Sequence, residues 1–215
     1  ASVCRQQNNV TYTIPAVTGA ATYVWHYTGT GATYSASTTG ASNTLSFNNT
    51  ATSGTLSVWG VNSSGDSSIA SRDVNITVNV IPSVTINPAT VAVCAGDAVT
   101  LTAGGATTYS WSNGGGSNAV ATFSPTANAT YTVTGTTLGC SAIVSRQVTV
   151  HSLPNVQITP ASASVCAGET VTLTANGAGT YSWSHGGGGN ATASFTPTAT
   201  TSYIVTGTDA NNCKK

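Results

Sequence analysis

Apolar and polar side chains alternate along much of the chain with a period of two. Residues 99–103 read Val-Thr-Leu-Thr-Ala, and residues 131–134 read Tyr-Thr-Val-Thr. Such alternation places apolar side chains on one face of a β-strand and hydroxyls on the other. Turns rich in Gly, Pro and Asn separate the strands, as at residues 113–116, in the manner of small antiparallel sandwiches. The pattern predicts an all-β fold of antiparallel β-sandwiches with roughly seven strands each.

An internal repeat sets the domain organisation. At an offset of 72 residues the chain matches itself from residue 88 onward, with a one-residue insertion before the last cysteine. The matched positions include Cys94 with Cys166 and Trp111 with Trp183. The repeat defines module 2 (residues 82–153) and module 3 (residues 154–215). Residues 1–81 lie outside this register but contain the same kinds of strand, which predicts a divergent module 1.

The two junctions between modules are short and contain proline, at residues 80–83 and 150–154. Such sequences favour extended, semi-rigid connections. Module 3 ends two residues after its last cysteine, whereas module 2 continues for about ten more residues after the equivalent position. We therefore expect module 3 to lack its last strand. Either the chain continues past Lys215, or a strand from another molecule completes the sheet.

The cysteines predict disulfides inside the modules. Cys94 and Cys140 occupy the same repeat positions as Cys166 and Cys213, so we expect the pairs Cys94–Cys140 and Cys166–Cys213. Cys4 is then a free thiol, either an orphan or one that pairs with another chain. Closely paired Cys or His ligands, as in zinc sites, are not seen. Disulfides indicate an oxidising, extracytoplasmic environment.

Charge and motifs argue against several functions. The chain has five Lys plus Arg, five Asp plus Glu and three His, with a formal net charge of zero. A neutral chain lacks the clustered cations that bind nucleic acid or anionic membranes, and no apolar run is long enough to insert into a membrane. Titratable groups are too few for catalysis, so we predict no enzyme and no cofactor.

No metal site is predicted either, because Asp66 and Asp73 lack the further carboxylates that a calcium site needs. His185 matches Asn113 in the repeat and is interpreted as a turn residue.

Three motifs carry a resemblance to a known family. Modules 2 and 3 share Val-Cys-Ala-Gly-(Asp/Glu)-x-Val-Thr-Leu-Thr-Ala, then Tyr-Ser-Trp-Ser-(Asn/His)-Gly, then Pro-Thr-x-x-x-(Thr/Ser)-Tyr-x-Val-Thr-Gly-Thr. This pattern resembles the Ig-like repeats of large secreted and cell-surface proteins of the Bacteroidota. Residues 9–15 and 21–25 resemble the PKD-like modules found beside them. The resemblance covers essentially the whole chain and implies a tandem array of three Ig-like or PKD-like β-sandwiches.

The resemblance also implies a function and a location. It suggests a non-catalytic repeat region of a large adhesin, secreted by the type IX system, that acts as a stalk, filament and adhesion module on the cell surface, as in the adhesins of gliding motility. Neighbouring repeats of the same chain, and a surface polysaccharide or protein ligand, are the expected partners. The alternative is a set of carbohydrate-binding or spacer modules attached to a secreted hydrolase.

Tryptophans supply the candidate contact site. We expect Trp25, Trp111 and Trp183 in the sandwich cores, with the disulfides at the rim. Aligning residues 56–60 with 131–135 places Trp59 on an outward face, with His26 on the same side of the neighbouring strand. An exposed Trp favours a contact with a partner or glycan. The competing interpretation is that Trp59 covers a loop of its own module.

Overall fold

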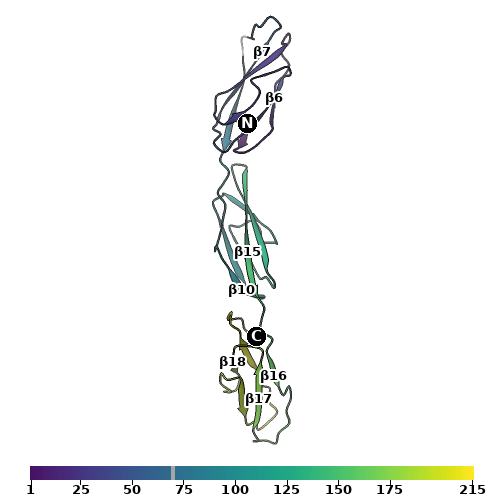
Figure 1. Cartoon of the computed structure of the whole chain (residues 1–215), viewed down its shortest axis with the longest axis vertical. Helices are drawn as coiled ribbons and strands as arrows, with labels where there is room; N and C mark the ends of the chain where they lie inside the picture. Colours follow the sequence, from purple (N-terminus) through teal and green to yellow (C-terminus); the bar gives the residue numbers. More distant parts are fainter. Residues whose placement is uncertain (69–70) are drawn as a thin grey trace. The chain divides into compact units, whose positions relative to one another are not determined.

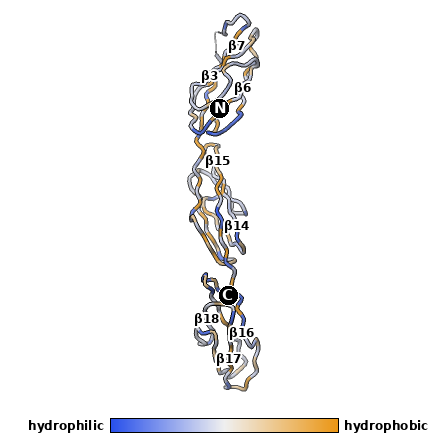
Figure 2. Tube along the Cα trace, in the orientation of Figure 1, coloured by the Kyte–Doolittle hydropathy of each residue, from blue (hydrophilic) through white to orange (hydrophobic). Residues whose placement is uncertain are grey.

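The computed structural model describes residues 1–68 and 71–215 and is all-β. Its strands form three groups, which Figure 1 shows in purple, in teal, and in green to yellow. Each sheet contains strands of one predicted module only. Figure 2 shows hydrophobic and hydrophilic residues interspersed along every group, as expected for strands with one face turned to a core. None of the described residues is helical.

Module 1 contains two sheets. One has the order β1-β8-β7-β3-β5 and the other the order β2-β6-β4. The strands are β1 (Ser2–Cys4), β2 (Val10–Thr13), β3 (Thr22–Tyr27), β4 (Ala32–Thr33), β5 (Ser37–Thr38), β6 (Ser42–Phe47), β7 (Gly54–Val61) and β8 (Arg72–Asn79).

Module 2 also contains two sheets, with the orders β10-β15-β14-β12 and β13-β11-β9. It has the seven strands expected from the sequence. They are β9 (Thr85–Asn87), β10 (Ala92–Cys94), β11 (Val99–Gly104), β12 (Thr108–Trp111), β13 (Val120–Phe123), β14 (Ala129–Thr137) and β15 (Cys140–His151).

Module 3 has the sheet orders β16-β17-β19 and β18-β20. Its strands are β16 (Gln157–Thr159), β17 (Val171–Asn176), β18 (Thr180–Trp183), β19 (Thr192–Phe195) and β20 (Val205–Thr208). The register of β11 with β13 recurs in β17 with β19, because Val99 faces Phe123 as Val171 faces Phe195.

One feature of the topology differs from the antiparallel sandwich predicted from the sequence. The first strand of module 1, β1, runs parallel to the last, β8, with Cys4 beside Asn79. In module 2, β10 runs parallel to β15, with Cys94 beside His151. Alternation of side chains does not encode strand direction, so the sequence pattern could not reveal these parallel pairs.

By its packing the chain divides into two compact units. The first comprises Ala1–Thr85, Ala103–Ser110 and Val133–Val144, and the second comprises Ile86–Thr102, Trp111–Thr132 and Ser145–Lys215. Strands β14 and β15 contribute residues to both units, so each unit includes part of module 2. The module boundaries after residues 81 and 153 remain a prediction, which domain-by-domain expression can test.

The cores are apolar and centred on aromatic rings. In module 1 Leu45, Phe47 and Leu56 are almost fully buried, and Trp25 packs with them. In the second unit the same ring cluster occurs twice. Trp111 meets Phe123 edge-on with ring centroids 6.1 Å apart. Trp183 meets Phe195 at 5.9 Å in the same way. The predicted core positions of Trp25, Trp111 and Trp183 are therefore confirmed.

Candidate functional site at the module junctions

Two disulfides connect residues of successive modules. Cys4 of module 1 is bonded to Cys140 of module 2, with Cα atoms 5.6 Å apart. Cys94 of module 2 is bonded to Cys213 of module 3, with Cα atoms 5.5 Å apart. The first cysteine of each pair, Cys4 or Cys94, ends a short edge strand that runs beside the last strand of its module. The second, Cys140 or Cys213, directly follows a turn of the next module. Each junction therefore contains two covalent connections, the main chain and a cystine.

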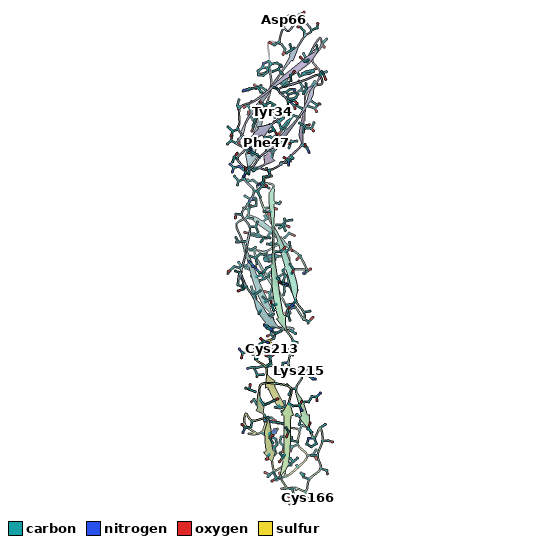
Figure 3. All side chains as sticks on the ribbon, viewed as in Figure 1. Tyr34, Phe47, Asp66, Cys166, Cys213 and Lys215 are labelled. Carbon is teal, nitrogen blue, oxygen red and sulfur yellow. A yellow bond between two sulfur atoms is a disulfide. The ribbon has the colours of Figure 1, made fainter. Side chains whose placement is uncertain are left out.

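The pairing predicted from the sequence is wrong. Cys140 is the first residue of the twelve-residue strand β15, whereas Cys94 lies beside His151, the last. Twelve strand residues span about 36 Å, far beyond the Cα separation of roughly 4.4–6.8 Å that a cystine allows. Figure 3 places Cys166 and Cys213 at opposite ends of module 3. Cys4 is not free, and the free cysteine is the exposed Cys166.

The first junction belongs to the first unit and is fixed by hydrogen bonds around Asn79. The backbone N–H of Arg5 donates to the Asn79 carbonyl at 2.9 Å, which holds the segment after Cys4 against the end of β8. The Asn79 side-chain amide donates to the carbonyl of Leu138 at 3.0 Å, in the turn that precedes Cys140. Both cysteines are thus brought to the same place by hydrogen bonds of their neighbours to Asn79.

The chain that follows this junction packs closely against module 2. A Cβ atom on Gly135 would lie 2.5 Å from the Val84 side chain and 2.8 Å from the Ala106 side chain. Only glycine lets Val84, which directly follows the junction at residues 80–83, approach strand β14 so closely. Module 3 repeats the arrangement, with Val156 packed over Gly207.

The second junction belongs to the second unit and repeats the first. The N–H of Ala95 donates to the carbonyl of His151 at 2.9 Å, as Arg5 does to Asn79. The Asp209 carboxylate accepts the backbone N–H groups of Asn211 and Cys213, both at 2.8 Å. This carboxylate shapes the turn that holds Cys213, which is fully buried in the disulfide bridge.

Trp59 and His26 lie on one outward sheet face of module 1, as predicted. In the register of β3 with β7, Val24 faces Trp59 and His26 faces Ser57. The side chains of Leu56 and Val58, which alternate with these, are buried. Trp59 is half-buried and His26 is exposed. Their contact role remains a prediction.

Asp73 completes the row of His26 and Ser57 from strand β8. Ser71 and Ser57 donate hydrogen bonds to its carboxylate and lower the pKa of that group from its ordinary value. The Ser57 hydroxyl therefore serves a carboxylate rather than an imidazole, which is not the arrangement of an activated nucleophile. Among residues 1–68 and 71–215, no three His, Cys, Asp or Glu side chains form a possible metal-binding cluster. That part of the chain also has no helix long and apolar enough to cross a membrane.

Comparison with known proteins gives one family match, to part of module 1, and a set of solved structures with Ig domains. Residues 1–75 match the family model of a PKD-like domain. A three-Ig fragment of titin, in an E-to-A variant, aligns with 100% of this chain and 92% of its own, at 12% identity and a TM-score of 0.43. The N-terminal eight Ig domains of Down syndrome cell adhesion molecule align with 100% of this chain and 34% of theirs, at 14% identity and a TM-score of 0.41. No curated protein sequence matches the chain significantly.

The sheets of the structure and the family match together show which kinds of domain the chain contains. Module 1 contains the segment similar to a PKD-like domain. Modules 2 and 3 have paired sheets and Trp-centred cores of the Ig-like kind. Domains of these types generally serve as non-catalytic adhesion or spacer modules. The chain is thus an all-β array of PKD-like and Ig-like β-sandwich modules.

Proposed function

We propose that this chain is a spacer and adhesion segment of a secreted cell-surface protein, with modules held together by cystines at their junctions. The observation that carries the proposal is that both disulfides join consecutive modules. A bridge inside a module would stabilise that module alone. A bridge across a junction restricts bending and separation of its two modules, which is what a stalk requires. Disulfides also fit an oxidising, extracellular location.

The junctions can be tested by breaking one bridge at a time. The double variant Cys4→Ser/Cys140→Ser removes the first bridge, and Cys94→Ser/Cys213→Ser removes the second. Cys166→Ser, which removes a free thiol, is the matched control. Small-angle X-ray scattering should show a broader distribution of interatomic distances for each double variant than for the control. Scattering curves that coincide for all variants would refute the clamping role.

The cell-surface role needs a cellular test. Antibodies raised against residues 1–215 should label intact cells of the source organism without permeabilisation. Deleting the segment in frame should reduce attachment to surfaces, and gliding if the parent protein is a motility adhesin of the Bacteroidota type. Antibodies that bind only after permeabilisation would contradict the proposed location.

A second candidate function is carbohydrate binding by the outward face of module 1. Trp59 and the 38% exposed Val24 face each other there, and His26 and Asp73 supply polar groups beside them. An apolar ring next to hydrogen-bonding groups is the chemistry that a sugar face can use. Glycan-array binding that disappears in Trp59→Thr but persists in Ile204→Thr would support this function. An array without signal would exclude it.

A further inference from the structure

One arginine of module 2 is partly buried and has no acidic partner. Arg146 lies in strand β15 two positions before the fully buried Val148, so its side chain is on the inner face of the sheet. Its guanidinium donates hydrogen bonds to the backbone carbonyls of Ile86, at 3.1 Å, and of Ala89. Within residues 1–68 and 71–215 no carboxylate balances its charge.

The hydrogen-bonding capacity of this guanidinium is only partly used. A guanidinium donates through its Nε and through both terminal nitrogens. Each terminal nitrogen of Arg146 makes one of the bonds to Ile86 and Ala89. The Nε–H is buried without an acceptor, which costs free energy. The remaining N–H on each terminal nitrogen can donate to an acceptor from outside the chain.

Module 1 shows that the sandwich does not need an arginine at this position. The parallel pairings of β1 with β8 and of β10 with β15 align the two modules so that Arg146 corresponds to Val74. Val74 packs against the apolar core of module 1. A valine therefore completes the same sheet without a buried, unsatisfied Nε. A cation kept where an apolar side chain fits indicates a role beyond folding.

Arg146 also lines an open pocket with a volume of about 460 Å³. The pocket belongs to the second unit and lies where residues 89–92 meet strand β15. Thr90, Gln147 and Thr149 bring hydroxyl and amide groups to it, and the rest of its lining is apolar. None of the described residues that line it is acidic. One cation among neutral polar groups is complementary to a ligand with one negative charge and several hydroxyls.

We propose that this pocket binds a uronic acid unit of an acidic polysaccharide. The carboxylate of the sugar accepts the N–H groups that remain on the terminal nitrogens of Arg146. The ring hydroxyls form hydrogen bonds with Thr90, Gln147 and Thr149. The pocket volume lies within the range of sites for small ligands. The inference is independent of the junction bridges and of the outward face around Trp59.

The first test compares two ligands that differ only in charge. The probe is tetragalacturonate, and the control is its methyl ester, which has the same rings without the carboxylates. Isothermal titration calorimetry of the intact chain at constant ionic strength should show at least about tenfold tighter binding of the acid than of the ester. Absence of binding, or equal binding of the two ligands, would overturn the proposal.

Two substitutions identify the charge that is responsible. Arg146→Val introduces the residue of the equivalent position in module 1, so the variant should fold, and it should bind tetragalacturonate at least about tenfold more weakly. Arg72→Val removes the same charge from an exposed position of module 1 and should leave the affinity unchanged. Equal losses in both variants would mean general attraction of a polyanion and would count against the pocket. The comparison of acid and ester needs no variant, so it holds even if Arg146→Val unfolds.

Nuclear magnetic resonance locates the binding site and tests the class of ligand. Tetragalacturonate should shift the amide resonances of residues 89–92 and 146–149 and leave those of residues 22–27 unchanged. Shifts confined to other residues would refute the site. Hexaglutamate supplies carboxylates without ring hydroxyls and should bind at least about tenfold more weakly than tetragalacturonate. Equal or tighter binding of hexaglutamate would assign the pocket to acidic peptides and overturn the proposed ligand class.

Discussion

Two tyrosine hydroxyls in the core of module 1 differ in whether they find a partner. Tyr27 donates to the carbonyl of Thr52 at 2.7 Å. The Tyr12 hydroxyl is buried without a hydrogen-bond partner. Burial raises the pKa of both phenols, and for Tyr12 the neighbouring Tyr27 raises it further. The ring of Tyr12 therefore contributes to the core, whereas its oxygen costs free energy.

This difference predicts opposite effects of the same substitution. Tyr12→Phe removes an unsatisfied hydroxyl and should raise the free energy of unfolding by about 1 kcal/mol. Tyr27→Phe leaves the Thr52 carbonyl without its donor and should lower it by about 1 kcal/mol. Urea denaturation of the two variants measures both values. A loss of stability in Tyr12→Phe equal to that in Tyr27→Phe would contradict the assignment.

Asp73 predicts a pH dependence at the acid end. Its pKa lies below the ordinary value because Ser71 and Ser57 donate to the ionised carboxylate. A carboxyl whose pKa is lowered by folding stabilises the native state above its unfolded pKa, and the stabilisation is lost as pH falls through the folded pKa. In Ser71→Ala the pKa of Asp73, followed by NMR, should rise toward its ordinary value. Thr77→Ala on the same strand is the control and should leave this pKa unchanged.

At the scale of strands, much of the fold could be predicted from the sequence. The alternation at Val99, Leu101 and Ala103 predicts strand β11 with its buried face, and Trp111 and Trp183 lie in the cores as expected. The parallel pairing of β10 with β15 could not be predicted, because the period of two is the same for both strand directions.

The disulfide pairing could not be predicted from the sequence, for a different reason. The repeat contains cysteines of two kinds. One ends the short edge strands β1 and β10 (Cys4, Cys94) and recurs at the matching position of module 3 (Cys166), and the other follows a turn (Cys140, Cys213). Disulfides within each module and disulfides between successive modules are equally consistent with these repeat positions. Only the direction of β10 along β15 excludes the first scheme. Cys4, interpreted from the sequence as having lost its partner, is bonded to the turn cysteine of the next module, Cys140.

Equivalent strands in modules 2 and 3 differ in how well they are covered. Leu101 of β11 is fully buried, and Leu173 of β17 is 7% exposed in an open groove of module 3 that is lined by residues 160–165 and 197–203. Leu101→Ala should therefore cost about 4 kcal/mol and Leu173→Ala about 2 kcal/mol, because a site open to water leaves a smaller cavity penalty. Urea denaturation monitored by hydrogen exchange at each strand measures the two losses. A larger loss for Leu173→Ala would show that the groove is closed in solution.

At the scale of the whole molecule, the order of the bonded cysteines along the chain is 4, 94, 140 and 213, and the two bridges overlap in sequence. Each closes a long loop, with sequence separations of 136 and 119. A single loop of this size stabilises the folded state by on the order of 5 kcal/mol in the chain-entropy model. Because the loops overlap, the two contributions are not additive.

The overlap of the two bridges also determines which residues carry the load when the ends of the chain are pulled apart. Tension applied at Ala1 and Lys215 takes the shortest covalent route, which enters at Cys4, crosses to Cys140, returns along the main chain to Cys94 and crosses to Cys213. Residues 5–93 and 141–212 lie off this route. Modules 1 and 3 are thus shielded from tension, and only the segment between Cys94 and Cys140 can unravel, pulled in the reverse of its chain direction.

A single-molecule force measurement has a definite outcome for this route. At about 3.5 Å per extended residue, the oxidised chain should reach a contour length of about 190 Å and the reduced chain about 750 Å. Pairing within modules would instead give about 420 Å. Under this route module 2 unravels while modules 1 and 3 keep their folds and their exposed faces, although tension passes through the bridges at their edges.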